Sequence, residues 1–106
     1  MPPIDYMKVL DIAALTLDTE SHIEVKAQDL NIFNASLSSE DGSLFEIQMK
    51  INEYDLELSL DKKVMDKKQF QKWLTKFEYQ LEQQFFKNIS IHQSETKNEY
   101  KVKVQF

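Results

Sequence analysis

Acidic side chains alternate along residues 53–61, and their spacing is suited to chemistry. They are Glu53, Asp55, Glu57 and Asp61. On a β-strand these positions share one face, where neighbouring carboxylates can bind a cation or act as a general acid and base. The alternative is a solvated strand face whose like charges are neutralised by a neighbouring strand that carries Lys101 and Lys103. We favour the solvated face, because the chain contains no calcium-loop motif.

Two histidines, His22 and His92, are the other groups suited to metal binding or proton transfer. Both fall on the polar faces of predicted strands, and no H-E-x-x-H motif is present. The chain also has no Cys, and its single glycine, Gly42, rules out a glycine-rich phosphate loop. We therefore expect no catalytic residue, no metal site and no cofactor.

A cluster of lysines surrounds the start of the longest predicted helix. It consists of Lys62, Lys63, Lys67, Lys68, Lys72 and Lys76. Positive charge at a helix N-terminus opposes the helix dipole, so the cluster does not serve helix stability. It predicts a docking patch for an acidic partner; the alternatives are a nucleic-acid backbone and a surface that only aids solubility. All basic residues are Lys and none is Arg, which argues against nucleic acid.

The longest predicted helix spans residues 66–87. Asp66 and Gln69 have the spacing of a capping box, and Met65 with Phe70 has that of a hydrophobic staple. One apolar stripe at helical spacing follows, made of Phe70, Trp73, Leu74, Phe77, Leu81 and Phe85. The stripe predicts that one face of this helix packs against a sheet.

Two aromatic residues, Tyr79 and Phe86, lie on the other side of this helix, within about 20° of each other. Aromatic side chains are preferred anchors of interfaces. We therefore predict a surface that binds another protein or a second copy of the chain, with a homodimer expected. The surface consists of Tyr79, Phe86, Gln83, Glu82, Lys72 and Lys76. The alternative is that the N-terminal segment or the C-terminal hairpin covers both rings.

Alternating apolar residues predict strands elsewhere in the chain. The expected strands are residues 6–17, 22–37, 44–60, 89–93 and 99–106. The first is ambiguous, because its apolar residues fit helical spacing as well; we choose a strand because β-type sequence follows it. Turns or bulges are expected near residues 28–31, at Asp41-Gly42, and near Asn52-Glu53, where the apolar positions change from odd to even.

These elements predict a single α+β domain over residues 1–106, a mostly antiparallel sheet with one long amphipathic helix on one face. The net charge of −5 conceals an asymmetry. Residues 1–61 hold three Lys and thirteen Asp or Glu, whereas residues 62–106 hold ten Lys and five Asp or Glu. The two halves either interleave in the fold and neutralise each other, or lie apart and make the molecule strongly polar.

No apolar run approaches the roughly 18 residues of a membrane span, so we expect no membrane partner. The N-terminal residues lack the pattern of a signal peptide, and with the absence of Cys they indicate a cytoplasmic protein. The sequence contains no motif that identifies a family. We expect a non-catalytic protein–protein interaction module, such as an adaptor, inhibitor or chaperone-like protein, without a small-molecule substrate. The alternatives are non-specific nucleic-acid binding through lysines and a small enzyme of unrecognised type.

Overall fold

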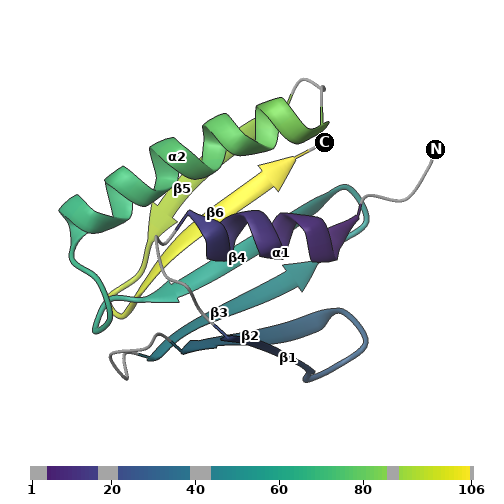
Figure 1. Ribbon diagram of the computed structural model, residues 1–106, viewed down its shortest axis with the longest axis horizontal. Coiled ribbons are helices and arrows are strands. Elements are labelled where there is room, and N and C mark those ends of the chain that lie inside the picture. Colours follow the sequence, from purple (N-terminus) through teal and green to yellow (C-terminus); the bar gives the residue numbers. More distant parts are fainter. Residues whose placement is uncertain (1–4, 17–21, 39–43, 86–88, 106) are drawn as a thin grey trace.

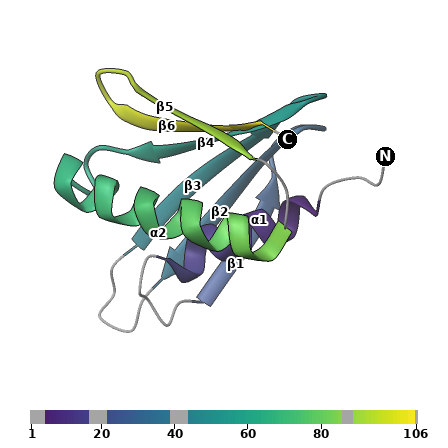
Figure 2. The ribbon, with the colours of Figure 1, turned by 90° about the horizontal axis from the view of Figure 1, so that it is seen from above.

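Six strands form one antiparallel sheet in the order β1-β2-β3-β4-β6-β5 (Figure 1). The computed structural model describes residues 5–16, 22–38, 44–85 and 89–105. The strands are β1 (His22–Ala27), β2 (Ile32–Ser38), β3 (Leu44–Ile51), β4 (Asp55–Asp61), β5 (Ser90–Glu95) and β6 (Glu99–Gln105). Two helices, α1 (Tyr6–Leu15) and α2 (Lys67–Phe85), lie on one face of the sheet (Figure 2). The predicted α+β class, with the long helix packed on an antiparallel sheet, is confirmed.

Residues 6–17 do not form the predicted strand; Tyr6–Leu15 is an α-helix. The reason is that neighbouring residues are buried together, Val9 beside Leu10 and Ile12 beside Ala13. A strand points neighbours to opposite faces, whereas a helix places such residues on one side. Asp5 starts the helix, because its side chain accepts a hydrogen bond from the Lys8 backbone N–H at 3.1 Å.

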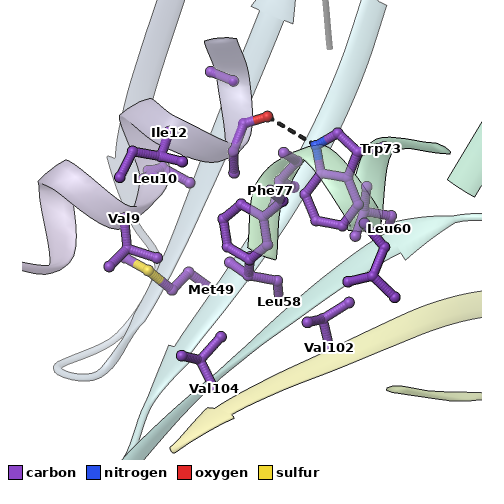
Figure 3. Packing of buried hydrophobic residues seen from close by; sticks show 14 of the residues in the cluster. Val9, Leu10, Ile12, Met49, Leu58, Leu60, Trp73, Phe77, Val102 and Val104 are labelled. Atoms are coloured by element: carbon purple, nitrogen blue, oxygen red, sulfur yellow. Dashed lines mark hydrogen bonds between the residues drawn. The ribbon is translucent and has the colours of Figure 1, made fainter. Parts of the chain in front are cut away.

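Both helices pack on the apolar face of the sheet. The Phe70 ring of α2 stacks on Tyr100 of β6, with 4.4 Å between ring centroids. In Figure 3, Val9 of α1 lies beside Met49 of β3. Each helix therefore covers a different part of the same apolar face, and Val9 and Met49 are fully buried.

Trp73 joins the two helices. Its indole Nε1 donates a buried hydrogen bond to the carbonyl oxygen of Ala13 at 3.0 Å, drawn as the dashed line in Figure 3. The same oxygen accepts a bond from the Thr16 hydroxyl at 2.9 Å. The last carbonyls of a helix have no partner within the helix, so Trp73 satisfies one end of α1 while its own buried N–H gains an acceptor.

Two long predicted strands are each divided by a turn, as expected. Gln28 N–H donates to the Ile32 carbonyl at 2.8 Å between β1 and β2, and Asn52 N–H donates to the Asp55 carbonyl at 2.8 Å between β3 and β4. In the second turn, Ile51 is paired with Leu56. Paired residues share a face of the sheet, which explains why the apolar positions change from odd to even. The predicted Asp41-Gly42 turn lies outside the described residues.

The predicted start of the long helix is confirmed in detail. Asp66 N–H donates to Gln69 Oε1 at 2.9 Å, and Gln69 N–H donates to Asp66 Oδ1 at 2.8 Å, which is a complete capping box. Met65 and Phe70, the predicted staple, are both buried. The helix itself is Lys67–Phe85, and residues 86 and 87 of the predicted range lie outside the described residues.

The variant Trp73→Phe tests the link between the helices. It removes the indole N–H and part of the ring, so we expect the free energy of unfolding to fall by about 2–3 kcal/mol. Thr16→Val, which removes the hydroxyl shared between the Ile12 and Ala13 carbonyls and keeps the indole bond, should cost less, about 1 kcal/mol. Urea unfolding followed by circular dichroism measures both. A Trp73→Phe protein as stable as the parent would show that the hydrogen bond does not hold the helical layer together.

Candidate functional site

An open groove of about 730 Å³ runs between the two helices, and we name it the helix groove. Its walls are mostly apolar. The lining residues are Lys8, Asp11, Ile12 and Thr16 from α1 and its C-cap, and Thr75, Lys76, Tyr79, Gln80 and Gln84 from α2. Volumes of about 300–1,000 Å³ with apolar walls and a few polar groups are typical of sites that enclose a small molecule; here the groove is open and large enough to accept a side chain of a partner.

Tyr79 lies beside this groove with 59% of its surface exposed. The Trp73 hydrogen bond fixes α1 next to α2, yet α1 leaves the Tyr79 ring uncovered. Glu82, Gln83 and Lys72 of the predicted surface are exposed as well. Phe86, the second predicted aromatic anchor, lies outside the described residues.

The lysine cluster divides into two groups with different surroundings. Lys62 Nζ is 2.6 Å from Glu95 Oε2, and Lys67 Nζ is 3.1 Å from Glu95 Oε1. Lys62 Nζ also lies 5.3 Å from the centre of the buried Tyr100 ring. These two lysines connect the start of α2 to the β5–β6 hairpin, which gives them a structural role.

Lys63, Lys68 and Lys72 form the second group. They are exposed, and none forms an ion pair with a residue that the structure describes. Lys68, Lys72 and Tyr79 follow i, i+4, i+11 spacing, which places them within about 40° on one side of α2. We name this side, made of Lys68, Lys72, Thr75, Tyr79 and Gln83, the α2 outer face.

The alternating carboxylates of β4 lie on the sheet face opposite the helices. Glu57 Oε1 is 3.4 Å from Lys101 Nζ, and β4 is paired with β6 so that Glu57 stands opposite Lys103. For Glu57, the predicted neutralisation by lysines of a neighbouring strand is therefore confirmed. His92 is exposed, and its Nε2 lies 3.0 Å from Gln105 Oε1. Over the described ranges, no three His, Asp or Glu side chains come together as a metal site.

The sheet order separates the two charged halves of the chain. Strands β1 to β4 are neighbours on one side, and β6 and β5 occupy the other. Within the sheet, the acidic half and the basic half meet where β4 pairs with β6, and α1 of the acidic half also contacts α2 of the basic half. The strands of the two halves therefore do not interleave in the sheet, although the helix of each half packs beside the helix of the other.

One wall of the helix groove was not predicted. The sequence predicts a strand for Lys8, Asp11, Ile12 and Thr16 and places the N-terminal segment near Tyr79 only as an alternative, whereas in the fold these four residues form a helical wall of the groove. The signal that indicates this wall is local: the helical alternative for residues 4–17 together with Asp5, which stands three residues before Lys8 in a capping position.

The variant Glu95→Gln tests the structural pair of lysines. Hydrogen bonds from Lys62 and then Lys67, with their positive charges, lower the pKa of Glu95 from its ordinary value of 4.5. The carboxylate therefore stabilises the fold above pH 4.5, and this contribution is lost as pH falls through the lower pKa of the folded chain.

We expect the parent to be more stable than Glu95→Gln near neutral pH, with the difference vanishing in acid. Urea unfolding between about pH 7 and pH 3 measures this. Glu82→Gln is the control, because Glu82 forms no ion pair with a described residue. A difference that persists unchanged in acid would mean that charge is not what holds the hairpin.

The comparisons with known proteins complete the description of this site. No family model, no curated protein and no solved structure matches the chain. Within the described residues, neither helix is both long and apolar enough to cross a membrane. The function is therefore inferred from the geometry of the helix groove and the α2 outer face.

Proposed function

We propose that this protein is a non-catalytic binding module that holds another protein against the α2 outer face. The observation that carries the proposal is Tyr79, an aromatic ring that is 59% exposed at the rim of an apolar groove of about 730 Å³. A tyrosine in this position supplies a large contact area with little loss of conformational entropy. Aromatic residues next to concave apolar surface are frequent hot spots of protein interfaces.

The charges around Tyr79 indicate the chemistry of the partner. Lys68 and Lys72 stand on the same side of α2 and have no ion pair within the described part of the chain. Unpaired cations beside an apolar groove complement an acidic segment that also carries an apolar side chain. The partner that fits is therefore a protein segment whose acidic residues contact the lysines while its apolar side chain enters the helix groove.

The ion pairs of the lysine cluster support a protein partner over a nucleic acid. Lys62 and Lys67 are both engaged by Glu95, so two of the six clustered cations are already paired. Nucleic-acid affinity depends on the number of phosphates that are neutralised. Interface affinity depends on a few buried anchors, and Tyr79 with its groove supplies one.

The variant Tyr79→Ser tests the proposal. We expect a partner captured by the tagged chain, in cells of the organism that encodes it, to bind about thirtyfold more weakly, as for a typical hot spot. Lys72→Glu should weaken the same complex. Added salt should weaken the complex of the parent protein, because it screens the attraction between the lysines and the acidic partner. Affinities are measured with the purified partner by isothermal titration calorimetry.

Tyr54→Ser is the matched control. Tyr54 is 74% exposed but lies in the turn between β3 and β4, away from α2. Neither tyrosine is buried, so both variants should unfold at the temperature of the parent protein. A partner that binds Tyr79→Ser and Lys72→Glu as tightly as the parent would refute the α2 outer face as the binding site.

A further inference from the structure

Strand β1 forms one edge of the sheet and has a neighbour, β2, on one side only. Among the described elements, none lies along its outer edge (Figure 1). It has six residues, His22–Ala27, without Gly or Pro. An edge strand of this kind offers a row of backbone donors and acceptors to another strand.

The register shows which backbone groups face outward. Gln28 N–H bonds to the Ile32 carbonyl at 2.8 Å, and this pair continues the β1–β2 register in which His22 stands opposite Ser38. Hydrogen-bonded pairs alternate along an antiparallel ladder, so even-numbered residues of β1 bond to β2. The N–H and C=O groups of Ile23, Val25 and Ala27 therefore point to the open edge.

We propose that β1 pairs with β1 of a second copy of this chain, antiparallel and centred on Val25. Val25 would stand opposite Val25 of the second copy, and Ile23 opposite Ala27. Three such pairs form about six interchain hydrogen bonds. The two sheets would become one continuous sheet with a two-fold axis perpendicular to it, and both helical layers would lie on the same side.

The side chains select this register. The side chains of Glu24 and Lys26 are 63% and 78% exposed, and within one copy Lys26 Nζ lies 4.0 Å from Glu24 Oε1. When the pairing is centred on Val25, Glu24 of each copy stands opposite Lys26 of the other, which gives two pairs of opposite charge. Cross-strand pairs of this kind are favourable. Centring on Glu24 or on Lys26 would instead oppose like charges. Val25 is partly buried against the core on the helix side, so its pairing extends the apolar face across the junction.

The other edge strand, β5, does not meet the same conditions. Its outward backbone groups belong to Ile91, Gln93 and Glu95, because Thr96 N–H bonds to the Glu99 carbonyl in the β5–β6 register. Symmetric pairing would place Ile91 opposite Gln93 or Glu95, an apolar side chain against a polar or charged one. Glu95 is moreover held by Lys62 and Lys67. Of the two edge strands, β1 is therefore the one suited to pairing with a second copy of itself.

Self-association at β1 has an electrostatic signature. Each copy carries a net charge of −5, so two copies repel each other at long range. Salt screens this long-range repulsion, and we expect the dimer to tighten between low and physiological ionic strength. This response is opposite to that expected for a partner on the α2 outer face, which keeps the two contacts distinguishable.

Charge reversal at the edge tests the proposed register. The contact is small, so we expect a weak dimer, which sedimentation equilibrium of the full chain detects. Glu24→Lys alone and Lys26→Glu alone should each weaken it about tenfold or more, because each creates two repulsive pairs. The double variant Glu24→Lys/Lys26→Glu restores opposite charges and should return to within about threefold of the parent.

Glu46→Lys is the matched control, because it changes the net charge equally at an exposed position of the central strand β3. Tyr79→Ser should leave self-association unchanged. Val25→Pro deletes one outward N–H without removing a bond to β2, and it should abolish the dimer; circular dichroism checks that the sheet is intact. A monomer at about 1 mM, a double variant that stays monomeric, or a series of species larger than dimers would overturn the proposal.

Discussion

The hydrogen bond from the Trp73 indole to the Ala13 carbonyl is the constraint on which the helical layer depends. A buried indole N–H needs an acceptor, and the last carbonyls of a helix need donors. One bond meets both needs and fixes where the C-terminal end of α1 lies against α2. Together with the burial of Val9 and Leu10 against the sheet, it places the wall of the helix groove that carries Ile12 and Thr16 opposite Tyr79.

The electrostatics of the molecule follow from the order of the strands. Strands β1 to β4 come from the acidic half of the chain and are neighbours in the sheet. The β5–β6 hairpin of the basic half joins them through the pairing of β4 with β6. Opposite charges meet at this junction, where Lys101 approaches Glu57.

The lysines near the start of α2 show how the same residue type serves two purposes. Lys62 and Lys67 share the two oxygens of Glu95 and hold the hairpin against the helix. Lys68, the next residue, and Lys72, about one turn further along, face solvent on the side of α2 that also carries Tyr79. The two proposed contacts, the α2 outer face and the β1 edge, belong to opposite sides of the molecule, so occupation of one leaves the other accessible.

Local patterns determined most of the elements. Three segments fit one period only, and the structure contains the corresponding helix and strands. They are the stripe from Phe70 to Leu81 and the alternation along residues 55–61 and 99–105. The Asp66–Gln69 capping box likewise marks the start of the helix. Tyr79 follows from the same count, because the side opposite a single apolar stripe faces solvent. Whether another segment of the chain covers Tyr79 was left open by this count, and the fold leaves Tyr79 59% exposed.

The tertiary structure decided what local patterns leave open. Residues 6–15 fit both periods, and they became a helix because adjacent apolar residues such as Val9 and Leu10 could be buried together on sheet area that α2 leaves uncovered. The division of the lysines depended on where Glu95 came to lie. A periodic pattern reports which face of an element is apolar, but the surface that covers that face is assembled from residues distant in the chain.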